Sequence, residues 1–265
     1  MSRAARAGSA GARFAGWLLP GAVLAATLAA WEAFVALSGT PAYVLPAPSR
    51  VLRTLAADWP VLAPALGVTL RLTLAGFASA AAGGVLMGVA LTRSRWAELA
   101  FSPYAVILQV TPLVAIAPIL VIYAGVTATV YLSVFLVAFF PVLAATMAGL
   151  RAADPALSDL FRLYRATPAQ RLFQLELPSA APFIAAGVRT AGGLSLIGAV
   201  VAEFVAGAGG AGSGLAYRIV EASYRLNVPR LFASVLLICV AGLLIYAIVS
   251  VACAALVRRW RPQGG

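Results

Sequence analysis

The sequence contains no histidine and no lysine, and it has only 8 acidic residues against 19 basic ones, all of which are arginine. Without histidine, histidine-based catalytic triads and the usual histidine metal sites are excluded. Without lysine, the chain has no GxxxxGKS/T phosphate loop and does not bind a nucleotide in that manner. We therefore expect no catalytic residue, no metal site and no cofactor in this chain. Any energy source that the chain uses would have to come from a partner.

Cysteine is also scarce. Cys239 and Cys253 are the only two, and they fall in one apolar stretch. On a single helix, 14 positions correspond to about 21 Å, which is too far for a disulfide between them. We interpret both as packing residues.

Apolar residues dominate the chain. They make up 63% of it, charged residues only 10%, and the mean hydropathy is +0.98. A soluble domain cannot bury so much apolar surface, so the sequence predicts an all-α integral membrane protein in contact with lipid. In such a chain a net charge of +11 is typical of arginine-rich cytoplasmic loops rather than of a nucleic-acid partner.

About six membrane spans are expected. Leu99 to Leu150 holds 52 residues without a charge. A single helix of that length would reach about 78 Å, so this stretch must contain two spans. The segment from Tyr123 to Thr129, which contains Gly125, is the best break between them. The other expected spans are 14 to about 38, 72–92, about 180–206 and 231–257. Between the first two spans we expect a short interfacial helix, with Ser49 as its N-cap.

The distribution of arginine predicts the orientation. The side with both termini and the loop between the fourth and fifth spans carries twelve arginines, and the opposite side carries six. The positive-inside rule therefore places the termini in the cytoplasm. This gives a cytoplasmic tail (1–13), a single membrane domain (14–257) with a cytoplasmic loop (151–179), and a second cytoplasmic tail (258–265). We favour a retained first span over a cleaved signal peptide, because its uncharged run is long.

The cytoplasmic loop 151–179 carries its own helix signals. Asp154 followed by Pro155 predicts a helix start, and Thr167-Pro168-Ala169-Gln170 predicts a second one with a capping box. We expect the second helix to end at Leu177-Pro178. The first helix should present Leu157, Leu160, Phe161 and Tyr164 on one face, with Asp159 and Arg162 away from it. An amphipathic linker lying on the membrane surface would show the same pattern.

Polar groups inside the spans suggest a mechanism or a structural role. Glu203 lines a pathway or gate, or forms an interhelical bond, and the sequence alone does not separate the two. For Arg189 we favour a structural role over an anion site, and for Glu32 an interhelical hydrogen bond. The third span carries Gln109, Thr111 and Pro112. A span interrupted by proline is a candidate lining of a route, or is kinked only for packing.

The spacing of the loop resembles that of a known family. Permease subunits of bacterial binding-protein-dependent ABC importers carry Glu-Ala-Ala, three residues, Gly, nine residues, Ile, one residue and Leu-Pro. Here Asp159-Leu160-Phe161, Arg165, Leu175 and Leu177-Pro178 stand at those positions. The stretches WEAFV, YVLPAPSRV, TLRLTLAGF and LPSAAPFIAAGVRTAGGLSLIGAVVAEFVAG are similar to the nitrate/taurine/sulfonate branch of these permeases.

The resemblance implies a type I ABC importer permease in the bacterial inner membrane. It would work as a homodimer with a cytoplasmic ABC ATPase dimer, which would hold ATP and Mg²⁺, and with an extracytoplasmic substrate-binding protein, and would itself catalyse no reaction. The substrate would be a small organic anion such as a sulfonate, taurine or nitrate, or a thiamine-pyrimidine precursor. The implied ATPase-coupling residues are Asp159, Leu160, Phe161, Arg162, Tyr164, Arg165, Ala166, Leu177 and Pro178.

Arg165 replaces the family's glycine at a turn that suits a positive φ, where a side chain costs about 1 kcal/mol or more. We hypothesise that Arg165 gains a contact with an acidic rim on the ATPase.

The rival class of protein is a self-sufficient channel or secondary carrier, which would predict internal repeats and a coupling-ion site.

Overall fold

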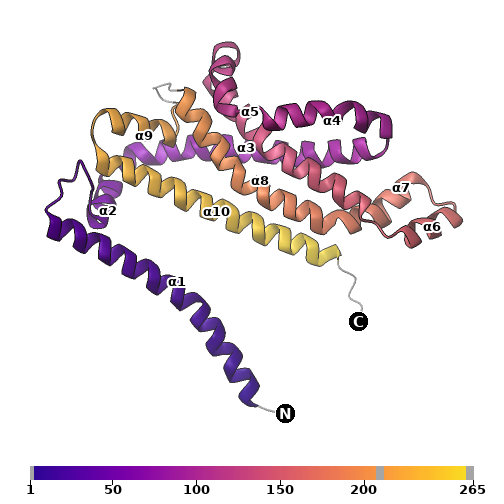
Figure 1. The fold of residues 1–265 in the computed structure, drawn as a ribbon, viewed down its shortest axis with the longest axis horizontal. Helices are drawn as coiled ribbons and strands as arrows, with labels where there is room; N and C mark the ends of the chain where they lie inside the picture. Colours follow the sequence, from indigo (N-terminus) through magenta and orange to yellow (C-terminus); the bar gives the residue numbers. More distant parts are fainter. Residues whose placement is uncertain (1–2, 207–211, 261–265) are drawn as a thin grey trace.

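The computed structural model describes residues 3–206 and 212–260, with side chains for 19–206 and 212–258. Every regular element in that part of the chain is helical, which confirms the predicted all-α class (Figure 1). The elements are α1 (Arg3–Ser38), α2 (Pro48–Ala57), α3 (Trp59–Thr92), α4 (Arg95–Val110), α5 (Leu113–Arg151), α6 (Pro155–Leu163), α7 (Pro168–Arg171), the π-helix η1 (Leu172–Glu176), α8 (Leu177–Ala206), α9 (Leu215–Tyr224) and α10 (Val228–Trp260).

Among the described residues, five helical segments are long and apolar enough to cross a membrane: Leu19–Ser38, Trp59–Thr92, Leu113–Arg151, Pro168–Ala206 and Val228–Arg258. The third expected span is not one helix. It divides into α4 and the first part of α5, because the chain is extended at Thr111 and Pro112. Proline lacks the amide that a continuous helix needs.

The predicted break between the third and fourth spans is confirmed. Gly125 lies inside α5 with φ 77° and ψ 168°, which is not helical, and α5 bends there. Glycine is suited to this position because it has no Cβ to clash at positive φ. The first part of α5 therefore protrudes at the top of the view in Figure 1.

The second span starts earlier than predicted. We expected it from Leu72, but α3 begins at Trp59. Pro60 is in the first turn, where a missing amide costs no intrahelical bond. Arg71 lies within the helix with its side chain exposed, so the charge of Arg71 did not mark the start of the helix.

The predicted tail residues 3–13 are helical and belong to α1. Of the second tail, 258–260 belong to α10, and 261–265 lie outside the described residues.

The bundle core forms around α5, which packs against α8 on one side and α3 on the other. Gly84 and Gly88 of α3 make the close approach possible. A Cβ on Gly84 would lie 2.9 Å from Val142 Cβ, and one on Gly88 would lie 2.8 Å from Thr146 Cβ. The Gly-x-x-x-Gly pattern at these residues therefore marks a helix–helix contact in this chain.

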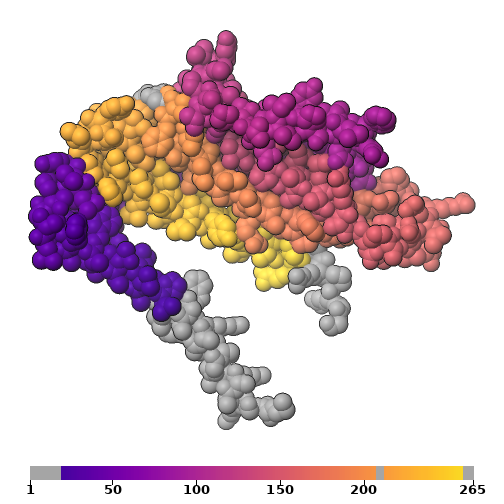
Figure 2. Space-filling model, viewed as in Figure 1, coloured from indigo at the N-terminus to yellow at the C-terminus, as the bar shows by residue number. Residues whose placement is uncertain are grey.

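The first helix lies apart from this core. In Figures 1 and 2 α1 extends away from the bundle, and its side chains from Leu19 to Ser38 are largely exposed. It is attached near its end, where it contacts α2 and where Trp31 packs against Phe232 of α10 with ring centroids 5.7 Å apart. Figure 1 also places α6 and α7 at the end of the molecule opposite α9, which gives the bundle a loop end and an α9 end.

Candidate functional site

Helix α6, in the loop 151–179, starts as the sequence predicts. Asp154 is its N-cap, and the carboxylate accepts a hydrogen bond of 2.8 Å from the amide of Ala156. Pro155 occupies the first helical position, where its lack of an N–H costs nothing. The cap satisfies one of the free amides of a helix that is only nine residues long. This short helix is therefore given a defined start by local residues.

The end of α6 has the geometry expected from the Arg165 position. Arg165 has a φ of 50°. Its amide donates to Arg162 O at 3.0 Å, and the next amide, of Ala166, donates to Phe161 O at 2.9 Å. These two bonds are those of a Schellman motif, which usually places glycine at this left-handed position. The expectation of a positive φ is confirmed, and a non-glycine side chain costs about 1 kcal/mol there.

The faces of α6 differ from the prediction in two respects. Phe161 is half-buried and lies on the same side as the buried Ser158. The exposed apolar face of α6 instead consists of Leu157, Leu160, Leu163 and Tyr164, with exposed fractions of 45%, 44%, 80% and 80%. Leu163 was missed because it stands at the margin of the helical stripe.

Asp159 and Arg162 form an ion pair at 2.7 Å beside this exposed apolar face. Their side chains are 65% and 73% exposed. At such exposure the pair contributes little to folding, less than about 1 kcal/mol. Both charged groups therefore remain accessible to another molecule.

The second loop helix begins with the predicted capping box, in which Thr167 and Gln170 bond reciprocally. It does not end at Leu177-Pro178, which corrects the prediction. The chain widens into η1, where the Leu177 amide donates to Leu172 O, and continues directly as α8. The π-turn changes the direction of the carbonyl groups that precede Pro178. The proline ring therefore does not clash with them, and the helix continues.

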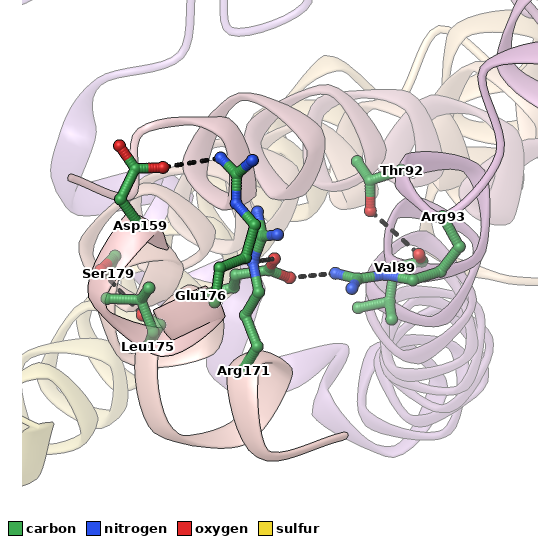
Figure 3. Close-up of polar contacts among 9 residues, drawn as sticks. Val89, Thr92, Arg93, Asp159, Arg171, Leu175, Glu176 and Ser179 are labelled. Carbon is green, nitrogen blue, oxygen red and sulfur yellow. Dashed lines mark hydrogen bonds and ion pairs between the residues drawn. The ribbon is translucent and has the colours of Figure 1, made fainter. Parts of the chain in front are cut away.

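Ion pairs that the sequence reasoning missed lie where this loop joins the bundle (Figure 3). Glu176, at the end of η1, pairs with Arg93 at the end of α3, and Arg171 Nε lies 2.9 Å from Glu176 Oε1. Arg151, at the end of α5, pairs with Glu98 of α4. These groups line a hollow of about 700 Å³. The signal available in the sequence was an acidic residue between two leucines, Leu175 and Leu177.

Glu203 lies at the α9 end. It is buried, and its carboxylate accepts from Thr69 Oγ1 at 2.8 Å and from the Ala216 amide at 3.0 Å. Thr69 Oγ1 also accepts from the Leu215 amide at 2.8 Å. Leu215 and Ala216 open α9, whose first amides have no intrahelical partner. The carboxylate thus joins α3, α8 and the start of α9.

The other charges of α9 are paired. Glu221 accepts from Arg218 at 2.8 Å and lies 3.0 Å from Arg225. Hydrogen bonding from Arg218 holds the pKa of Glu221 below its ordinary value. Arg230, at the start of α10, donates to Asp58 at 2.6 Å. The Arg230–Asp58 bond joins the start of α10 to the α2–α3 junction, whereas the contacts of Glu221 lie within α9 and its C-terminal turn.

The proposed pathway residues are not brought together. Gln109 is exposed and borders a hollow of about 120 Å³ between α4 and α5. Thr111 and Pro112 form the break between these helices, and Thr111 Oγ1 donates to Ile107 O of its own helix at 2.6 Å. Glu203 borders a different hollow, with Val126 and Tyr217.

Glu32 forms the interhelical bond that the sequence suggested. Its carboxylate accepts from the Ser49 amide at 2.9 Å and from Ser49 Oγ at 2.7 Å. Ser49 is therefore not the N-cap of α2. The N-cap is Ala47, and Glu32 caps the helix from outside it.

Arg189 is exposed on α8 and forms no ion pair within residues 19–206 and 212–258. No group of three or more potential metal ligands is found among the described residues.

The sequence of this chain is similar to the sequences of known proteins. Residues 80–262 match the family described as "Binding-protein-dependent transport system inner membrane component". The chain is 32% identical over 231 residues to a "Probable ABC transporter permease protein" of Haemophilus influenzae, covering 86% of this chain and 92% of the relative. It is 31% identical to the "Formylaminopyrimidine transport permease protein ThiX" of Halalkalibacterium halodurans (82% and 86%) and 28% identical to the "Putative aliphatic sulfonates transport permease protein SsuC" of Bacillus subtilis (86% and 82%).

Proposed function

Because the chain belongs to the family of inner membrane components of binding-protein-dependent transport systems, we propose that its loop 151–179 binds a separate cytoplasmic ATPase and that the bundle forms the substrate route. Membership makes the chain a multi-pass inner-membrane permease subunit of an ABC importer, with the type I permease fold. Members are transport components rather than enzymes. ATP binding and hydrolysis are assigned to the partner.

The exposed apolar face of α6 carries this proposal. Leu157, Leu160, Leu163 and Tyr164 are exposed on a helix that is capped at its start by Asp154 and closed at its end by a Schellman turn. A surface helix normally buries its apolar stripe. An apolar helix face flanked by charges has the composition of a protein interface, with an apolar centre and a polar rim. Asp159 and Arg162 supply that rim.

The orientation and the other partners belong to the same proposal. The excess of arginine on the side of the loop end puts that end in the cytoplasm. The α9 end then faces a substrate-binding protein outside. A second copy of this chain completes the route, and Gln109, Thr111, Pro112 and Glu203 are the residues of this chain proposed to line or gate it.

For the substrate, we propose a small organic anion of the sulfonate, taurine or nitrate type, or a thiamine-pyrimidine precursor. Relatives named for aliphatic sulfonates and for formylaminopyrimidine support these two classes. In such systems the binding protein selects the ligand. A thermal-shift screen of that protein against both classes, with riboflavin included because a relative is named for riboflavin transport, will show which ligand raises its unfolding temperature.

Uptake by reconstituted vesicles tests the function as a whole. We expect accumulation only when the ATPase, ATP and the liganded binding protein are all present, because nothing in the described part of the chain supplies an energy source. The control omits ATP and keeps everything else. Uptake by the chain alone without ATP would instead assign it to the self-sufficient channels or secondary carriers.

Arg165 gives a local prediction. We expect Arg165→Gly to relieve the positive-φ strain, worth about 1 kcal/mol, yet to weaken binding of the ATPase by removing a contact with an acidic rim. Leu226→Gly is the matched control, because Leu226 has a φ of 53° in the same kind of turn at the α9 end. Co-purification and uptake measure the outcome. If Arg165→Gly leaves both unchanged, the rim contact does not exist.

A further inference from the structure

The junction between α3 and α4, residues 93–98, lies against both ends of the loop 151–179. Arg93 pairs with Glu176 near the end of the loop, and Glu98 pairs with Arg151 at its start. We call these two contacts the loop-end ion pairs. Of the ion pairs within residues 19–206 and 212–258, only these two join the junction to another part of the chain. Figure 3 shows Arg93 extending from its helix toward Glu176 and Arg171.

The two pairs differ in strength. The Glu176 side chain is only 6% exposed and has two arginines, Arg93 and Arg171, at 36% and 41% exposure. A carboxylate so nearly buried is costly to leave unpaired, so a loop movement that broke this pair would be unfavourable. The Glu98–Arg151 pair, with side chains 28% and 55% exposed, is more hydrated and weaker.

The rest of the loop is weakly attached to the bundle. Of the residues that the structure describes, none in α6 or α7 belongs to a buried apolar cluster. α7 packs mainly against η1. A displacement of α6 therefore reaches the bundle through the two ends of the loop. Besides α5 and α8, with which the loop is continuous, the structure that lies against both ends is the α3–α4 junction.

The polarity of the pairs makes the connection specific. The junction carries a positive group at Arg93 and a negative group at Glu98. The loop carries the complementary negative Glu176 and positive Arg151. A shift that exchanged the partners would place like charges together at both ends, which is unfavourable. The junction is thus held in one register on the loop.

We propose that the loop-end ion pairs carry movement of the loop to α3 and α4, so that Arg93, Glu98, Arg151 and Glu176 are positioning residues for transport. This inference rests on the proposed binding of an ATPase to the loop. α3 contains Thr69, which bonds to Glu203 at the α9 end. Movement of α3 therefore reaches the carboxylate that holds the start of α9.

The test measures coupling separately from assembly. In the reconstituted complex of tagged chain, ATPase and binding protein, Arg93→Gln should leave the co-purified ATPase within about twofold of wild type. Uptake per ATP hydrolysed should fall about tenfold, within the range typical of coupling between sites. The charge exchange is made at the other pair, because Glu98 and Arg151 have no further ion-pair partner among the described residues. Glu98→Arg and Arg151→Glu together should give most of the wild-type ratio.

Control variants separate this role from a merely structural one. Arg95→Gln changes a neighbouring exposed arginine that borders the same hollow and forms no ion pair among the described residues, so uptake per ATP should stay at the wild-type value. Glu98→Gln breaks the more hydrated pair, where loss of folding is not expected, and should lower the same ratio to a smaller extent.

The contrary results are equally distinct. If Arg93→Gln and Glu98→Gln reduce folding or assembly while the remaining complexes transport normally per ATP, the pairs only stabilise the fold and the inference is wrong. Failure of the exchanged pair to restore the ratio also overturns it. If the wild-type chain binds no ATPase at all, the proposed function itself fails, and the inference fails with it.

Discussion

Replacing Leu160 with aspartate is expected to remove the ATPase from the purified complex. Leu160 stands in the exposed apolar face of α6 and is 44% exposed, so aspartate there does not disturb a buried core. In the proposed interface the new charge would be desolvated without a partner. Loss of a central interface residue costs 2 kcal/mol or more, about 30-fold in affinity.

Affinity purification from native membranes, followed by an ATP hydrolysis assay of the captured protein, measures this effect. The matched control is Leu226→Asp, which changes a leucine 73% exposed at the opposite end of the molecule. Phe161 is less suitable, because its half-buried ring packs toward its own chain. Equal capture by wild type and Leu160→Asp would favour the other interpretation of the loop, a linker lying on the membrane surface.

Replacing Gly214 with alanine should have the second large effect, at the opposite end of the chain. A Cβ on Gly214 would lie 2.0 Å from Glu203 Oε1 and 2.2 Å from the carboxyl carbon. The carboxylate cannot move aside without losing its bonds from Thr69 and Ala216. Each buried donor left without a partner costs roughly 1–3 kcal/mol. The unfolding temperature in detergent should fall, and uptake with it.

Gly212→Ala provides the control, because a Cβ there would meet nothing within 4 Å. It should unfold at the wild-type temperature. A normal unfolding temperature for Gly214→Ala would mean that the carboxylate is mobile, which contradicts the structural role. Glu203→Gln then separates the two roles of this residue. Stable folding without uptake identifies a gate, whereas a parallel decrease in both identifies a structural bond.

The sequence was informative wherever the cause of a structure is local. The caps at Asp154 and Thr167 depend on a side chain and an amide two or three residues away, and both were predicted. The left-handed turn at Arg165 and the bend at Gly125 likewise follow from short-range sterics. The membrane class followed from composition alone, because apolar surface on this scale requires lipid around it.

Errors arose where the outcome depended on distant partners. Ser49 was assigned as an N-cap, but Glu32, 17 residues earlier, binds it. Leu177-Pro178 was expected to end a helix, but a π-turn carried the helix through. Phe161 was placed on the exposed face of α6, although the burial of Ser158 shows that the helix is turned toward the chain on that side.

The amino-acid sequence by itself thus determined the class of the protein, the helix starts of the loop and the chemistry that the lack of histidine and lysine excludes. Only the tertiary structure decided which charges meet. Arg93 and Glu176 are 83 positions apart, and Thr69 and Glu203 are 134 apart. Pairs at such separations are selected by the packing of α3, α5 and α8, because a buried carboxylate is tolerated only where the fold brings a donor to it.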